Sequence, residues 1–146
     1  MKSDWILIAN ATRARLLEQE PGQKVRELRS FEHPAGRSRI GELADDRLGS
    51  ERNDRVYGAA AFQPRLDARH KEHRRFAREL AGYLEQQAQL GAYRRIEIFA
   101  SNPFLGELKA VVGDATLRLV GGAHDLDLTM VGKAEIGRRI AQAMKS

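Results

Sequence analysis

The sequence predicts a single three-layer α/β domain, with helices covering both faces of a mixed sheet. Apolar, β-branched runs suited to buried strands occur near the amino terminus and again at Arg95–Ala100. Stretches with the helical spacing of apolar residues lie between and after them, the longest at 67–90. The 146 residues, 42% of them hydrophobic, are enough for one core and leave no room for a second. We therefore expect one domain over residues 1–146.

The first part of the chain predicts three strands. Asp4–Asn10 is apolar on both faces, as expected for a central strand. Arg13–Gln19 is predicted as the second strand and ends before the turn signal Pro21-Gly22. Lys24–Phe31 alternates apolar and charged residues imperfectly and is predicted as the third. Because the connections are short, we expect an antiparallel meander.

The segment from Pro34 to Leu66 shows neither a helical nor a strand period. It contains four glycines and many charges, and its apolar residues are scattered. We therefore predict a long loop at about 34–66. Loops of this length inside a small domain are usually functional or flexible.

A long helix is expected after this loop. Asp67 is suited to be its N-cap, and the helix should reach about Leu90, with Gly91 as its stop. An apolar stripe runs along it over Phe76–Leu84. The next element is a strand, Arg95–Ala100, with alternate residues facing the core.

The rest of the chain predicts two helices separated by a short strand. One helix should begin at Asn102-Pro103, because proline is tolerated in the first turn, and should end at Gly113. Thr116–Gly121 is predicted as the strand and Lys133–Met144 as the closing helix. The predicted order is ββ(β)–long loop–α–β–α–β–α.

Composition restricts the possible function. The net charge of +5 favours acidic partners, of which nucleic acid is the commonest. No stretch approaches the roughly 20 apolar residues of a membrane span, and the run Trp5–Ala9 is too short for a signal-peptide core. We therefore expect a cytoplasmic protein without a membrane partner. The chain has no cysteine and no phosphate-loop, dinucleotide or serine-hydrolase motif, so no cofactor is predicted.

The segment Arg65–Arg78 carries the densest positive charge, six cations against Asp67 and Glu72. Residues three or four apart share a helical face, so four of these cations form a row opposite the apolar stripe. Such a row can follow a phosphate backbone. The alternative is a solvated face paired with acids of the loop. The predicted nucleic-acid-binding residues are Arg65, Arg69, Lys71, Arg74, Arg75 and Arg78.

Two pairs of residues are further candidate sites. His70 and His73 lie one helical turn apart and could ligate a metal or act as an acid–base pair. No third ligand has suitable spacing, so no metal site is predicted, and exposed helix histidines are the alternative. Ser101 and Asn102 follow the carboxyl end of a strand and open a helix, where α/β sheets commonly bind anions. The alternative there is an ordinary N-cap at Asn102.

Two runs, WILIANATRARL at 5–16 and HKEHRRFARELA at 70–81, resemble the bacterial family of small host-attachment proteins, described as required for attachment to host cells. NPFLGEL at 102–108 and the stretch from Asp125 to Thr129 are similar to that family as well. The resemblance covers nearly the whole chain.

That family is distantly similar to the middle domain of archaeal and eukaryotic peptide-chain release factors. The resemblance implies the same order of elements and places Arg75–Arg78 in the helix after the catalytic loop. In those factors a Gly-Gly-Gln loop enters the ribosome and positions water against the ester. The matching segment, Tyr57–Pro64, contains Gln63 but no Gly-Gly-Gln, and its alanines resist backbone angles that glycine allows. The resemblance thus implies docking rather than hydrolysis.

Three functional hypotheses follow. The preferred one is a non-catalytic cytoplasmic module that binds RNA or the ribosome through Arg65–Arg78 and the preceding loop. The second is a protein-interaction factor that influences attachment to host cells or surfaces, with a loop that orders on its partner. The third is an ester or peptidyl-tRNA hydrolase that uses Gln63, or His70 and His73.

Overall fold

The computed structural model describes residues 3–33 and 58–145, with side chains described from residue 68 in the second range. The fold is mixed α/β, as predicted, with five strands in the order β3-β2-β1-β4-β5. The strands are β1 (Ser3–Ala9), β2 (Arg13–Gln19), β3 (Arg26–Glu32), β4 (Tyr93–Ala100) and β5 (Val120–Asp125). Strands β1, β2 and β3 form the predicted antiparallel meander, whereas β4 pairs with β1 and β5 in parallel.

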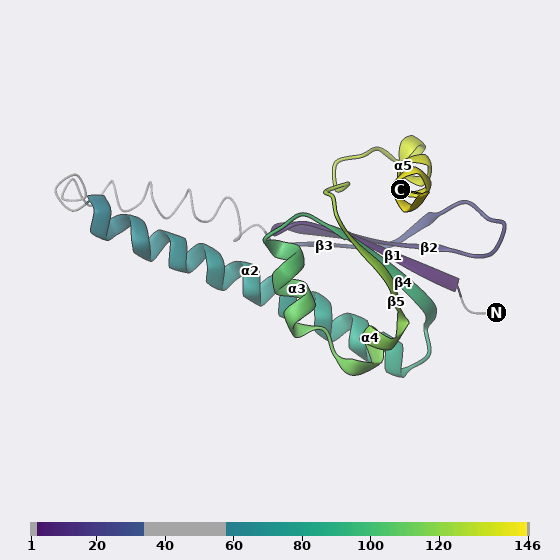
Figure 1. Ribbon diagram of the computed structural model, residues 1–146, viewed down its shortest axis with the longest axis horizontal. Coiled ribbons are helices and arrows are strands. Elements are labelled where there is room, and N and C mark those ends of the chain that lie inside the picture. The colour runs from purple at the N-terminus through teal and green to yellow at the C-terminus, as the bar shows by residue number, and fades with distance from the viewer. Residues whose placement is uncertain (1–2, 34–57, 146) are drawn as a thin grey trace.

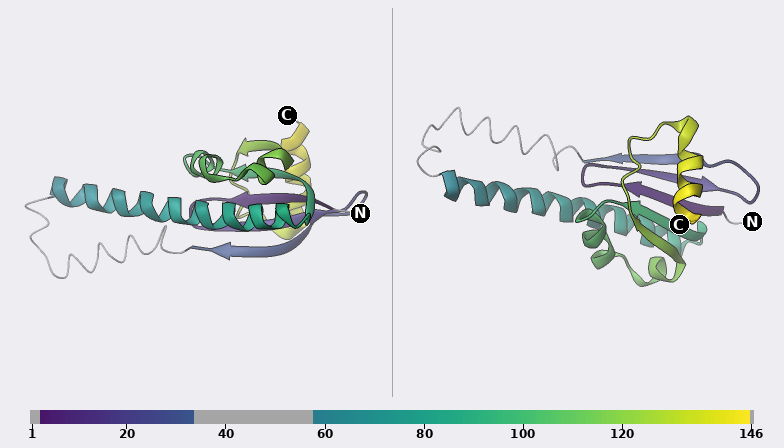
Figure 2. Two further views of the ribbon diagram at one scale, coloured as in Figure 1. Left: turned by 90° about the horizontal axis from the view of Figure 1, so that it is seen from below. Right: turned by 45° about the horizontal axis from the view of Figure 1, so that its top comes forward.

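Helices cover both faces of the sheet and make three layers (Figures 1 and 2). One face carries α2 (Gly58–Gln89), α3 (Phe104–Val111) and α4 (Asp114–Leu119). The other face carries α5 (Lys133–Lys145), which matches the predicted closing helix. The amino-terminal part of α2 runs well past the edge of the sheet (Figure 1).

Successive side chains of the central strands point to opposite faces of the sheet, so each face has its own hydrophobic core. On β1, Trp5 and Leu7 face α2, whereas Ile6 and Ile8 face α5. Because successive strand side chains point to opposite faces, a strand apolar at every position belongs between two helical layers. Trp5 also stacks on Tyr93, with ring centroids 4.4 Å apart.

The long helix begins nine residues earlier than the sequence predicted. We expected an N-cap at Asp67, but α2 starts at Gly58, so the predicted loop at about 34–66 is wrong for residues 58–66. Figure 1 shows this part of α2 extending beyond the sheet, and apolar periodicity predicts only those helical segments that pack one side against a core. Three consecutive alanines, Ala59–Ala61, favour the helix by propensity alone. Residues 34–57 lie outside the described residues.

The sequence prediction was also wrong for the region after β4. Thr116–Gly121 was predicted as a strand, but residues 114–119 form α4 and the strand β5 begins only at Val120. Glu85 of α2 accepts hydrogen bonds from the backbone N–H groups of Ala115 and Thr116, at 3.2 and 2.9 Å. This carboxylate caps α4 from a distant part of the chain, so local sequence does not reveal it.

The segment between β5 and α5 is hydrogen-bonded to the turn that follows β1. The Asn10 side chain accepts from the backbone N–H groups of Thr12 and Arg13 and donates to Asp127 and Thr129. Burial raises the pKa of Asp127, but its hydrogen bonds from Thr129 and Asn10 outweigh this and lower the pKa below its ordinary value. Asn10, in the first of the resembling runs, thus has a structural role.

Candidate nucleic-acid interface

Five exposed cations lie along α2 within about three turns. All five side chains are exposed, and four of them share one side of the helix, as the spacing predicted. We call this group the basic face of α2. Its members are Arg69, Lys71, Arg74, Arg75 and Arg78.

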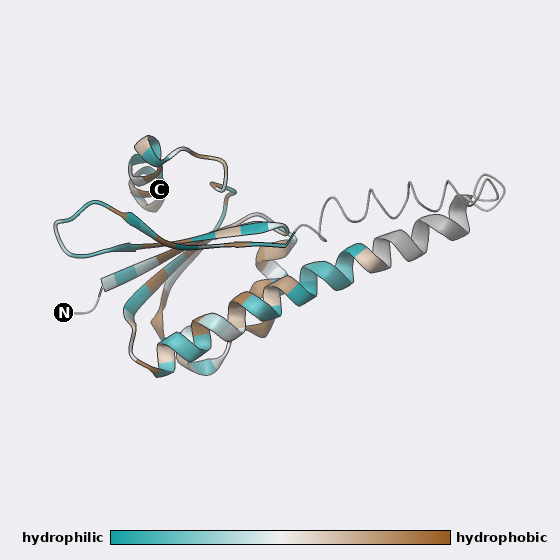
Figure 3. Ribbon diagram, turned by 180° about the vertical axis from the view of Figure 1, so that it is seen from behind, coloured by the Kyte–Doolittle hydropathy of each residue, from teal (hydrophilic) through white to brown (hydrophobic). Residues whose placement is uncertain are grey.

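The opposite side of α2 fixes how the basic face is presented. Phe76, Leu80 and Leu84 are at most 1% exposed and pack into the core beneath the sheet. Figure 3 shows the resulting mixture of polar and apolar residues around the helix. Because the buried stripe sets the rotation of the helix, the basic face points into solvent.

His33, just after β3, is a member of this region that the sequence did not reveal. Its ring stacks on Phe76 at 5.2 Å, and its Nε2 lies 2.8 Å from Glu72 Oε1. The other carboxylate oxygen of Glu72 accepts from Arg75 Nη1 at 3.3 Å. Glu72 therefore joins the end of β3 to the basic face. His33 and Glu72 are 39 residues apart in sequence, and no local pattern relates them.

Within residues 3–33 and 68–145, few acids lie close enough to neutralise the positive charge on the face. Arg75 is paired with Glu72, yet its side chain remains 56% exposed. Among the residues that the structure describes, no carboxylate forms an ion pair with Lys71, Arg74 or Arg78. The face can therefore offer several free cations to a polyanion.

Other residues of the predicted interface are only partly accounted for. The side chains of Arg65 and Gln63 lie outside the described residues, as do the loop acids that were the alternative partners of the cations. Gly58–Pro64, matched to the release-factor catalytic loop, is helical. The similarity to release factors itself stays a prediction.

His70 and His73 lie close together on α2, with ring centroids 6.5 Å apart. In the described ranges, 3–33 and 58–145, no group of three His, Asp or Glu side chains is arranged to hold a metal ion. An acid–base role for the pair stays a prediction.

Ser101 and Asn102 lie at the carboxyl edge of the parallel strands, as expected. However, Asn102 is not the N-cap of α3, because the cap position is Pro103 and no side chain caps it. Instead, the backbone N–H and the side-chain amide of Asn102 both donate to Asp125, each at 3.0 Å. Asp125 thus accepts hydrogen bonds from the donors that we predicted would bind an external anion. Anion binding at Ser101 and Asn102 stays a prediction.

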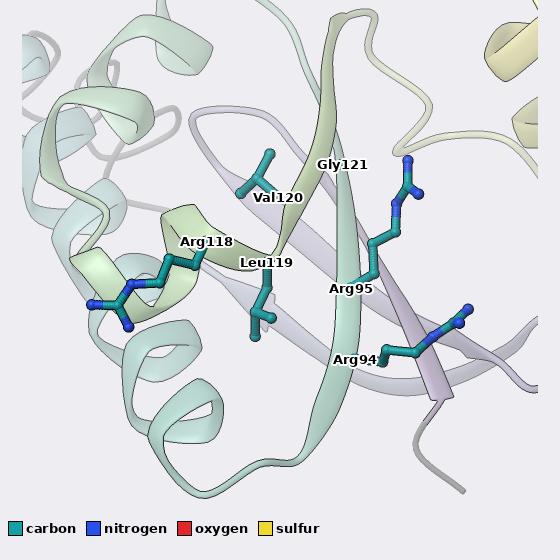
Figure 4. Close-up of a pocket in the computed structure, with 6 residues that line it drawn as sticks. All are labelled: Arg94, Arg95, Arg118, Leu119, Val120 and Gly121. Carbon is teal, nitrogen blue, oxygen red and sulfur yellow. The ribbon is translucent and has the colours of Figure 1, made fainter.

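A shallow cavity of about 440 Å³ lies at the opposite edge of the sheet, beside Arg94, Arg95 and Arg118. Figure 4 shows the three guanidinium groups pointing in different directions, with Arg118 directed away from the other two. Arg94 is paired with Asp4 and Arg95 with Glu97. The three side chains do not converge on one point, so the cavity is not arranged around a single anion.

Comparison with known proteins gives one result at the level of family. The model of a family described as "Protein required for attachment to host cells" matches residues 5–140. No curated protein matches the chain. None of the helices in the described part of the chain is long and apolar enough to span a membrane.

Proposed function

Because the chain belongs to the family of proteins required for attachment to host cells, we propose that it serves attachment as a non-catalytic RNA-binding module. The basic face of α2 would contact the RNA, free in the cytoplasm or on the ribosome. One observation carries the proposal: a row of exposed cations, most of them without an acidic partner among the described residues, on a helix that projects past the sheet.

The spacing of the cations suits a phosphate backbone. Helical residues three or four apart have Cβ atoms about 5–6 Å apart, so long arginine and lysine side chains can reach successive phosphates. Guanidinium groups also bind phosphate oxygens in pairs of hydrogen bonds. Phe76 and Leu80 are buried in the core, which fixes the rotation of the helix and so the direction in which the row of cations points.

The proposal predicts binding with little sequence preference. Contacts to phosphates carry no sequence information, and the basic face offers cations rather than a surface for stacked bases. Releasing counterions from single-stranded RNA gives a slope of about −0.7 per phosphate contact in a plot of log affinity against log salt concentration. Five cations would give a slope of roughly −3.5.

A direct test is fluorescence anisotropy with a labelled single-stranded RNA of mixed sequence, titrated at increasing salt. The double variant Arg74→Glu/Arg75→Glu should lower affinity by more than about tenfold and flatten the salt dependence. The matched control, Arg138→Glu/Lys145→Glu, makes the same change in net charge on α5, across the sheet. Equal loss in both variants, or no affinity for RNA at low salt, would refute the proposal.

The family description favours a second candidate, an attachment role through a protein partner. The basic face would then meet an acidic surface on that partner. Affinity purification with and without ribonuclease separates the two candidates. Recovery of ribosomes that is lost after ribonuclease treatment supports the RNA-binding module, whereas one protein recovered in both conditions supports the protein partner.

A further inference from the structure

A cavity of about 300 Å³ lies between the β2–β3 hairpin and the first turns of α5. A second hollow of about 350 Å³ adjoins it and shares Val25 and Lys133. Volumes of this size are typical of sites for small molecules. The apolar lining residues of the first cavity are Leu17, Val25 and Ile136, and its charged lining residues are Arg15, Arg26, Glu27 and Lys133.

Arg15 is the most informative of these residues, because its side chain is only 12% exposed. Its Nη1 donates to the carbonyl oxygens of Val131 at 2.7 Å and Thr129 at 3.4 Å, while Glu27 lies 3.5 Å from its Nε. Within the part of the chain that the structure describes, Nη2 has no acceptor. Because the existing contacts of Arg15 use Nη1 and Nε, Nη2 can donate to a ligand in the cavity that Arg15 lines.

Lys133 supplies a second cation from the other wall, at the first residue of α5. The amino-terminal turn of this 13-residue helix adds a positive partial charge at the same place. Arg26 is paired with Glu18 and Arg15 with Glu27, so these two ion pairs leave little net charge between them. The donors left for a ligand are therefore Arg15 Nη2, with no acceptor among the described residues, and the Lys133 ammonium group.

We propose that this cavity binds a small organic carboxylate with an apolar body. The carboxylate would accept hydrogen bonds from Arg15 and Lys133, and the apolar part would pack on Leu17, Val25 and Ile136. Inorganic phosphate would leave the apolar walls unused. The site lies under α5, on the opposite side of the sheet from the basic face of α2, so it is a separate surface from the one proposed to bind RNA.

Octanoate is a suitable probe, with octan-1-ol as the uncharged molecule of the same chain length. Titration calorimetry should show saturable binding of octanoate, and binding of the alcohol about tenfold weaker, as expected when a charge-assisted hydrogen bond is lost. In heteronuclear NMR spectra, the amides of Val25 and Ile136 should shift with octanoate. Absence of saturable octanoate binding, or equal affinity for the alcohol, would overturn the proposal.

Variants then locate the binding site. Arg15 also holds the linker before α5, so its removal risks the fold, and Lys133→Met is the better test. This variant should weaken octanoate binding by about tenfold while the alcohol is unaffected. Lys145→Met, at the far end of the same helix, is the matched control and should bind octanoate normally. Equal weakening by both substitutions would show non-specific charge attraction and overturn the assignment.

Discussion

The carboxylate of Glu85, in α2, accepts hydrogen bonds from both the backbone N–H and the hydroxyl of Thr116, in α4, each at 2.9 Å. Thr116 is fully buried, so these bonds satisfy polar groups that water does not reach. The pKa of Glu85 is lowered, chiefly by the backbone hydrogen bond from Thr116, and this outweighs the effect of desolvation. A single side chain thereby joins the long helix to the short one.

Glu85→Gln should make stability depend less on pH in the acid range. The lowered pKa means that the folded protein favours the charged carboxylate, so this stabilisation is complete above the ordinary value of 4.5 and is lost as pH falls through the folded pKa. The variant should be less stable than the wild type at pH 7, and the two should converge as the pH falls below the lowered pKa of Glu85 in the folded protein. Urea unfolding at several pH values measures this, with Glu135→Gln on α5 as the control. A difference that stays constant with pH would contradict the prediction.

Gly113→Ala should disturb the hydrogen bonds between Glu85 and Thr116, because Gly113 lies against the Glu85 side chain. A Cβ atom at Gly113 would lie 2.5 Å from Glu85 Cδ, so the carboxylate would have to move away from the start of α4. We expect a lower melting temperature in the wild-type background and a smaller loss when Glu85 is already alanine. A double-mutant cycle measures this coupling. Strictly additive effects would show that the alanine acts elsewhere.

Gly121→Ala and Gly82→Ala should change stability in opposite directions. A Cβ atom at Gly121 would lie 2.0 Å from Arg95 Nε, and displacing Arg95 would break its ion pair with the buried Glu97. Arg95 is half exposed and can swing aside, so the cost is the loss of a partly exposed ion pair, about 1 kcal/mol or less. Gly82 is exposed within α2 and has no atom within 4 Å of the added Cβ, so alanine there should stabilise by about 1 kcal/mol. Urea unfolding of both variants checks the signs, and stabilisation by Gly121→Ala would contradict the packing argument.

Elements that bury an apolar pattern were predictable from sequence. The strand Arg13–Gln19 was predicted with its observed bounds, and the buried stripe of α2 identified its carboxyl-terminal half. The start of α2 and the identity of α4 were not predictable in the same way. The first extends past the sheet against which the apolar stripe packs, and the second depends on Glu85, some 30 residues away in the chain.

The candidate interface was predictable to a similar extent. Helical spacing placed Lys71, Arg74, Arg75 and Arg78 on one exposed side without any tertiary information. The contact between His33 and Glu72 depends on how the end of β3 meets α2. The hydrogen bond from Asn102 to Asp125 depends on the order of the parallel strands. Such contacts between distant segments leave no periodic signal in the sequence.

Glu72→Gln should strengthen RNA binding while weakening the fold slightly. Glu72 is the one acid among residues 69–78, and its carboxylate pairs with Arg75 and meets His33. Removing its charge frees Arg75 and raises the positive potential of the basic face, so RNA affinity at low salt should rise by about two- to fivefold, the size expected for an exposed ion pair. Anisotropy measurements check this, with Glu135→Gln, the partner of Arg138 on α5, as the matched control. Because both substitutions change net charge equally, an identical gain in the two variants would mean that the total charge, and not the basic face of α2, determines affinity.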